Sequence, residues 1–134
     1  MSRKRILIVT AAVVATLGAA GGYALYLSNM REAVAKTKLD LEAFERGLAQ
    51  YKFVKSRYPP AEEGLEASIK AWAVLQCAQT SAPQKCIDQP RRVPLDAWGN
   101  AFRYRTDSPT HAVVTSAGPD GKFETSDDLH LKSP

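Results

Sequence analysis

The chain has 134 residues, of which 18 are basic and 14 acidic, and this length suits one small domain with an additional N-terminal segment. Three basic residues (Arg3, Lys4 and Arg5) precede a long apolar segment, so the remaining chain carries 18 − 3 = 15 basic and 14 acidic residues. The remaining chain is therefore close to neutral, and it contains no basic stripe with interleaved aromatic residues. These features give no support for nucleic-acid binding.

The segment from Ile6 to Leu27 contains no charged residue. As a helix with a rise of about 1.5 Å per residue it would extend roughly 33 Å, enough to cross a hydrocarbon core of about 30 Å. The preceding cations predict a cytoplasmic flank over residues 1–5, a transmembrane anchor over residues 6–27 and an exported domain over residues 28–134. The alternative is a cleavable signal peptide that is cut near Gly18–Ala20.

A single amphipathic helix is predicted to continue from the apolar segment to about Lys55. The sequence contains no proline before Pro59, and apolar residues recur at helical spacing along one face. The residues of this stripe are Val34, Leu41, Phe44, Leu48 and Tyr51. The stripe lasts only a few turns, so we expect it to pack against a domain of the same chain rather than to form a coiled-coil stem.

The head of the exported domain is predicted over residues 58–131. Pro59 and Pro60 end the long helix, and a second helix is expected over residues 61–76. The predicted inner face of that second helix consists of Leu65, Ile69, Trp72 and Gln76. Polar residues and two prolines predict a loop over residues 80–94.

The two cysteines, Cys77 and Cys86, lie in the exported part of the chain. An oxidising compartment favours a disulfide between them, which would stabilise the fold by roughly 2–3 kcal/mol. Two separate thiols are the alternative. A zinc site is less well supported, because no histidine or second cysteine pair lies nearby in the sequence.

Short strands are predicted after the loop. Residues 102–105 alternate between aromatic and basic side chains, residues 107–110 have turn composition, and residues 111–116 are rich in β-branched side chains. Residues 129–131 could form a last strand. The predicted fold class is α+β, with a small antiparallel sheet packed on the outer half of the long helix.

No combination of residues predicts an enzyme. His111 and His130 are the only histidines, and both fall at expected surface positions of strands. Ser116 has no G-x-S-x-G context, and no phosphate-binding glycine loop is present. We therefore expect no catalytic site.

The segment between the last two predicted strands is acidic. Its four carboxylate residues are Asp120, Glu124, Asp127 and Asp128. Ca²⁺ prefers six to eight oxygen ligands, and Gly121 would let the backbone turn its carbonyl groups inward. Adjacent residues in extended backbone point in opposite directions, so only one of Asp127 and Asp128 would bind directly, and we favour Asp128. Ser126 and Glu124 offer further oxygen atoms, but a solvated acidic turn remains the alternative.

Three motifs in the same order resemble the globular domain of the major pseudopilin of bacterial type II secretion systems. The first is Tyr58-Pro59 followed by Glu63-Gly64-Leu65, and the second is the run DAWGNAFRY over residues 96–104. The third is SAGPDG over residues 116–121, followed by Ser126-Asp127-Asp128-Leu129. Together with the long helix before them, they cover most of the chain.

The resemblance implies a pilin-like fold and a non-enzymatic structural subunit of a secretion pseudopilus. It implies a calcium site in which Asp120 and Asp128 supply carboxylates and Ala117 a backbone carbonyl, with Ser126 where the family has an acid. It also implies an inner-membrane protein with a periplasmic head, whose partners are other pseudopilins or inner-membrane proteins of the secretion system. Trp98, Gly99 and Asn100 are interpreted as a turn with a buried aromatic residue.

The N-terminus departs from the family pattern. Family members carry a prepilin-peptidase site followed by a glutamate within the apolar helix, whereas this chain has no acidic residue before Glu32. The alternative role is therefore a membrane-anchored accessory or binding module that does not polymerise.

Overall fold

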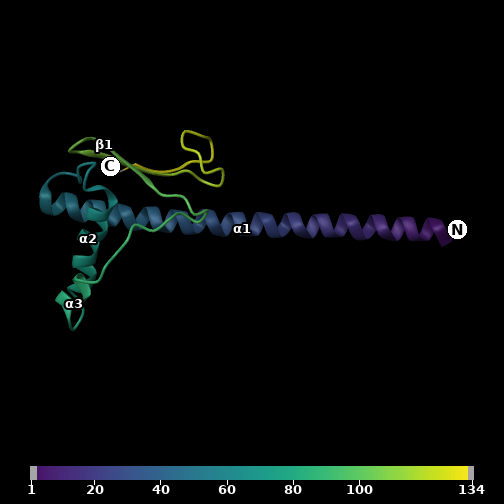
Figure 1. Ribbon diagram of the computed structural model, residues 1–134, viewed down its shortest axis with the longest axis horizontal. Coiled ribbons are helices and arrows are strands. Elements are labelled where there is room, and N and C mark those ends of the chain that lie inside the picture. Colours follow the sequence, from purple (N-terminus) through teal and green to yellow (C-terminus); the bar gives the residue numbers. More distant parts are fainter. Residues whose placement is uncertain (1–2, 133–134) are drawn as a thin grey trace. The chain divides into compact units, whose positions relative to one another are not determined.

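The computed structural model describes residues 3–132, with the side chains of residues 3–17, Ala19 and Lys132 outside the described part. The chain divides into two compact units between Ala33 and Val34. Helix α1 (Arg3–Lys55) belongs to both units and ends where the sequence predicts. The remaining elements all belong to the second unit (Figure 1).

The predicted anchor falls mainly on side chains that the structure does not describe. Among the described residues, no helix contains a stretch that is both long and apolar enough to span a bilayer. The side chains of residues 6–17 and of Ala19 lie outside the described part. The transmembrane anchor therefore stays a prediction.

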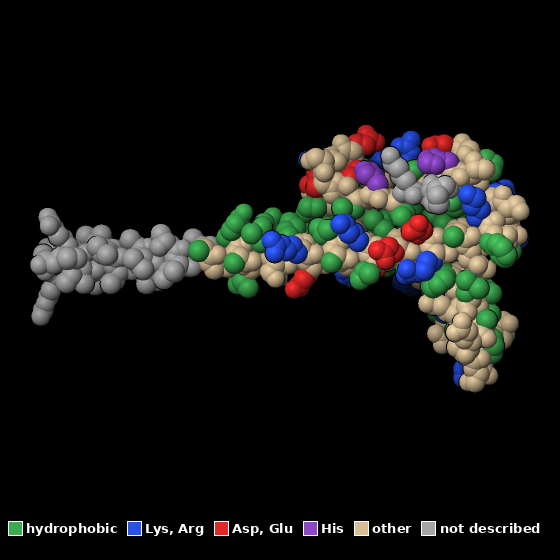
Figure 2. Space-filling view, turned by 180° about the vertical axis from the view of Figure 1, so that it is seen from behind, with side chains coloured by type: hydrophobic (Ala, Val, Ile, Leu, Met, Phe, Trp, Pro, Cys, Tyr) green, Lys and Arg blue, Asp and Glu red, His purple; other side chains and the backbone are tan. Residues whose placement is uncertain are grey.

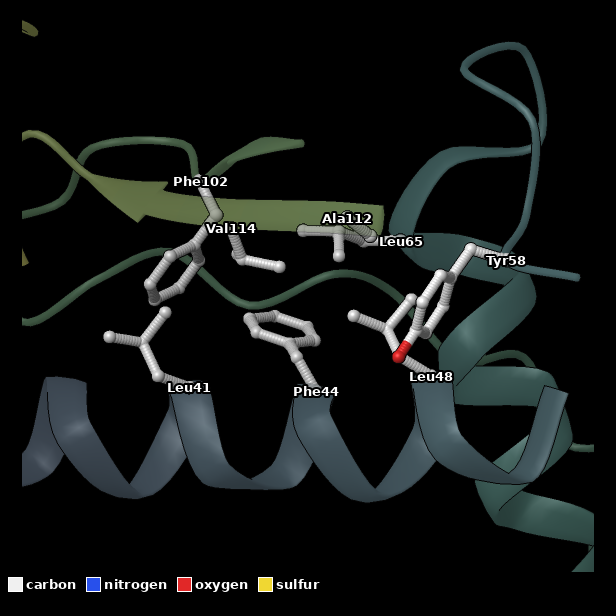
Figure 3. Close-up of a cluster of buried hydrophobic side chains, with 8 residues drawn as sticks. All are labelled: Leu41, Phe44, Leu48, Tyr58, Leu65, Phe102, Ala112 and Val114. Atoms are coloured by element: carbon white, nitrogen blue, oxygen red, sulfur yellow. The ribbon is translucent and has the colours of Figure 1, made fainter. Parts of the chain in front are cut away.

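In the second unit, α1 supplies one wall of the hydrophobic core. Leu41, Phe44 and Leu48 are at most 5% exposed, and they point toward side chains of the sheet (Figure 3). The rings of Phe44 and Phe102 pack edge to face, with centroids 5.0 Å apart. The other members of this cluster are Tyr58, Leu65, Ala112 and Val114. The predicted stripe is thus confirmed from Leu41 onward, while Val34 is only half-buried.

The predicted inner face of the second helix, α2 (Gly64–Cys77), is confirmed at Leu65, which is buried, and at Ile69, which is partly buried and packs against the core cluster. Gln76 is exposed, and Ser68, Ala73 and Cys77 are buried instead. Ser68 is buried where α2 closely approaches the backbone of α1, because a Cβ added at Gly47 would overlap the Ser68 carbonyl. The small residues Gly47 and Ser68 allow the two helices to approach each other closely at this point.

A short helix, α3 (Pro83–Ile87), lies within the segment predicted to be a loop. Pro83 stands in its first turn, where the missing N–H has no cost. A disulfide joins Cys77 to Cys86, as expected from the sequence, with the Cα atoms 5.6 Å apart. This bond ties α3 to the end of α2.

The sheet has three antiparallel strands in the order β1-β2-β3: β1 (Arg103–Ser108), β2 (His111–Ser116) and β3 (Leu129–Lys132). Val114 of β2 pairs with Tyr104 on one side and Leu131 on the other. Asp107 and Ser108 belong to β1 rather than to the predicted turn, because an irregularity after Thr106 carries the strand further. The helix with a small antiparallel sheet confirms the α+β class.

We expect Gly47→Ala to lower the free energy of unfolding by about 1–3 kcal/mol, the usual cost of overpacking. The added Cβ would lie 2.8 Å from the carbonyl carbon of Ser68 and closer still to its oxygen. Urea denaturation followed by tryptophan fluorescence measures the effect, since both tryptophans are in the second unit.

The matched control is Gly22→Ala in the same helix, where nothing lies within 4 Å of the added atom. The control should leave the midpoint unchanged. A wild-type midpoint for Gly47→Ala would contradict the close approach of α1 and α2.

Candidate functional site

The acidic loop occupies residues 117–128, between β2 and β3 (yellow in Figure 1). Its first residue, Ala117, is fully buried. Gly118 and Gly121 adopt the left-handed conformation (φ +65° and +68°), and the Gly121 N–H donates to the Gly118 carbonyl at 3.3 Å. These two glycines fold the start of the loop into a tight turn, because other residues rarely adopt this conformation.

Three of the four carboxylates bind backbone amides of the loop itself. Asp120 accepts the N–H of Lys122 at 2.8 Å. Asp127 accepts the N–H of Asp120 at 3.3 Å, and Asp128 accepts the N–H of Glu124 at 2.8 Å. Asp127 thereby connects the last part of the loop to the first.

The contact between Gly118 and Asp127 closes the loop. A Cβ on Gly118 would overlap the Asp127 carbonyl oxygen and lie 3.1 Å from its carboxylate Oδ2. The site therefore requires glycine at this position for both conformation and space. The backbone of Gly118 thus packs directly against Asp127.

Thr125 holds the Asp127 carboxylate in its ionised form. Its hydroxyl donates to Asp127 Oδ1 at 2.7 Å and lies 3.4 Å from Asp128 Oδ1. This side-chain hydrogen bond, together with backbone N–H groups, lowers the pKa of Asp127 from its ordinary value of 3.8. An ionised carboxylate is the form that binds a cation.

The carboxylate of Glu124 binds a side chain from outside the loop. It pairs with Arg103 of β1 at 3.3 Å, and its side chain is 81% exposed. The Arg103 guanidinium also lies 3.7 Å from the centroid of the Phe123 ring. Figure 2 shows acidic, basic and histidine side chains exposed together on the surface of the head.

The polar groups of the loop are carboxylate, hydroxyl and backbone carbonyl oxygens, which are the ligand types that Ca²⁺ prefers. Within the described part of the chain, no three histidine, cysteine or acidic side chains form a group that could hold a metal ion. A calcium site can instead combine two carboxylates with backbone carbonyls and water. Asp120 and Asp127 approach each other through the loop backbone, Asp128 contacts Glu124, and Ser126 is exposed.

The turn at residues 95–101 contacts the last residue of β2, Ser116, through a buried acid that the sequence analysis did not single out. Asp96 is only 4% exposed, and its Oδ1 accepts the N–H groups of Trp98 and Asn100 at 3.0 and 2.7 Å. Trp98 is half-buried, so the prediction of a buried aromatic was wrong. The signal was present in the sequence: an Asp that precedes a Gly-Asn pair commonly caps its own turn.

The comparisons with known proteins cover the part of the chain that includes the sheet and the acidic loop. Residues 26–132 match the family model described as type II secretion system (T2SS), protein G. The chain is 36% identical over 95 residues to a type II secretion system core protein G from Klebsiella pneumoniae, covering 70% of this chain and 66% of the relative. The corresponding protein of Escherichia coli K12 is 32% identical over 106 residues, covering 77% and 71%.

A solved structure is also similar. It is the major pseudopilin from the type 2 secretion system of enterohaemorrhagic Escherichia coli, 26% identical, with 75% of this chain and 86% of that chain covered at a TM-score of 0.49. The chain spans about two thirds of the length of the relatives from Klebsiella and E. coli K12.

We expect Thr125→Val to raise the pKa of Asp127 toward 3.8, because valine cannot donate the hydrogen bond that favours the carboxylate. Thr125→Ser keeps a hydroxyl and is the control. Because the folded pKa is lowered, the contribution of Asp127 to stability is present above its unfolded pKa and is lost as the pH falls through the folded value. An NMR titration of the Asp127 carboxyl carbon measures the shift, and identical titrations of the two variants would contradict this assignment.

Proposed function

The chain belongs to the type II secretion system protein G family, and from this premise we propose that it is a structural subunit of a secretion pseudopilus with a calcium-stabilised loop. The observation that carries the proposal is the family match over residues 26–132, which includes the sheet and the acidic loop. The proposed role is mechanical rather than catalytic. Similarity at the level of fold alone would not support it.

The proposed location is the bacterial inner membrane, with the head in the periplasm. The cations at residues 3–5 and the uncharged segment 6–27 support this orientation. The proposed partners are other pseudopilins or inner-membrane proteins of the secretion system.

The outward face of α1 supports assembly with such partners. Leu39 and Phe53 are 62% and 84% exposed, on a helix whose other face is buried. They are separated by about four helical turns and therefore lie on one side. Exposed large apolar side chains on one face of a helix are suited to contact with another protein.

A second candidate function is an accessory protein that keeps its anchor and does not polymerise. The absence of any acidic residue before Glu32 favours it, since the usual assembly contact of the family needs a glutamate in the apolar helix. Otherwise the two roles require the same head and the same membrane.

The N-terminus distinguishes the two roles. Mass spectrometry of the protein extracted from membranes should show a processed and methylated N-terminus within the apolar segment if the chain is a filament subunit. An intact N-terminus at Met1 or Ser2 would contradict the subunit role and support the accessory role.

The proposed calcium ligands are the carboxylates of Asp120 and Asp128 and the carbonyl of Ala117, with Asp127 and Ser126 beside them. A bound Ca²⁺ would supply positive charge that offsets the repulsion between these carboxylates. The ligand residues lie directly after β2 and directly before β3, so holding them together would also hold β3 on the sheet. An unfolded loop would bind the ion poorly, and binding would therefore stabilise the folded head.

We expect chelation by EDTA to lower the melting temperature of the head, and Asp120→Ala to abolish the difference. Calcium at about 100 times its Kd would contribute roughly 2.7 kcal/mol, which corresponds to several degrees. Differential scanning calorimetry of the full chain with calcium or EDTA measures it. Asp107→Ala removes an acid of β1 outside the loop and should keep the wild-type difference, whereas equal wild-type curves would exclude the calcium proposal.

A further inference from the structure

Residues 116–118 form the junction between β2 and the acidic loop. Side-chain hydrogen bonds fix this junction. The Ser116 hydroxyl is fully buried and donates to Asp96 Oδ2 at 2.6 Å. The same hydroxyl oxygen accepts the N–H of Gly118 at 3.1 Å. The carbonyl group of Gly118 also has a partner, because it accepts the side-chain N–H of Asn100 at 3.0 Å.

These hydrogen bonds fix one particular peptide plane. The N–H of Gly118 and the C=O of Ala117 belong to the same peptide unit, which is planar, so the two groups point in opposite directions. Holding the Gly118 N–H on the Ser116 hydroxyl therefore sets the direction of the Ala117 carbonyl. That carbonyl is the backbone ligand in the proposed calcium site.

The acceptor that orients Ser116 is itself fixed. Asp96 is held by two amides of its own turn, and the next residue, Ala97, donates its N–H to the buried hydroxyl of Thr37 on α1 at 3.2 Å. Thr37 is fully buried. The contacts thus run without interruption from α1 through the turn to the Ala117–Gly118 peptide.

We infer that Asp96, Ser116 and Asn100 are positioning residues for calcium, which set the Ala117 carbonyl in its binding direction before the ion arrives. This inference rests on the proposed calcium function. Residues behind the ligands of a metal commonly change its affinity by 10- to 100-fold when they are substituted. None of the three needs to touch the ion.

The test compares two buried serines. Isothermal titration of Ca²⁺ into chelator-treated, full-length protein in mild detergent gives the Kd of the wild type, Ser116→Ala and Ser68→Ala. Ser68 is the matched control, because it is also fully buried and makes one hydrogen bond as a donor, to the Leu65 carbonyl at 2.7 Å within α2. We expect Ser116→Ala to raise the Kd at least about tenfold, and Ser68→Ala to leave it within about twofold of the wild type.

A purely structural role of Ser116 gives a different result. Both variants would then melt at lower temperature in EDTA, and both would bind calcium with the same Kd. Equal Kd values for the two variants would overturn the inference while the calcium proposal stands. A wild-type chain that binds no calcium would overturn both.

Asn100→Asp provides an independent measurement, including for the case in which Ser116→Ala does not fold. The new carboxylate adds negative charge near the loop, so electrostatic attraction alone would lower the Kd. Loss of the donor to the Gly118 carbonyl would instead raise it, by about tenfold if Asn100 is a positioning residue. A Kd equal to or below that of the wild type would overturn the role of Asn100.

Discussion

The packing of α1 against β2 and the segment before β1 is the constraint on which the head depends. The sheet has three short strands, and such a sheet needs a partner for its apolar face to be stable. Phe44 and Leu48 of α1 provide that partner, together with Phe102 and Val114 from the sheet side (Figure 3). Each side chain of this size contributes about 1.5–3 kcal/mol when it is fully buried. The outer part of α1 therefore supplies one wall of the core of the head.

The turn at residues 95–101 joins this core to the acidic loop by polar contacts. Asp96 accepts hydrogen bonds from two amides and from the Ser116 hydroxyl, so a carboxylate that is only 4% exposed is well satisfied. Buried polar groups that are fully bonded rigidify the structure around them. Hydrophobic packing thus positions β2 against α1. The hydrogen bonds of Asp96 and Ser116 then fix the direction of the chain as it passes from β2 into the loop. The conformation of the loop is consequently linked to that of α1.

The sequence predicts the features that depend on local pattern, namely the end of α1, the apolar stripe from Leu41 and strand β2. It does not predict those that depend on distant contacts. The burial of Ser68 depends on its close approach to Gly47, which lies 68 − 47 = 21 residues earlier in the chain, on α1. Glu124 of the loop pairs with Arg103 of β1, a partner 21 residues away in the sequence. Within the site, the acidic residues are evident from composition, whereas the buried role of Asp96 depends on a partner twenty residues away.

The hydrogen bonds inside the loop do not compete with a cation. An ionised carboxylate has about four lone-pair positions, and Asp120 and Asp128 each accept one amide at short distance. Oxygen positions therefore remain for a metal ion, and the amide bonds restrict the directions that the carboxylates can take. Because these groups are already ordered, the binding of a cation would require little additional ordering of the loop, and the associated cost in free energy would be small. The loop's own amides thus offset part of the mutual repulsion of its carboxylates and order them within the loop.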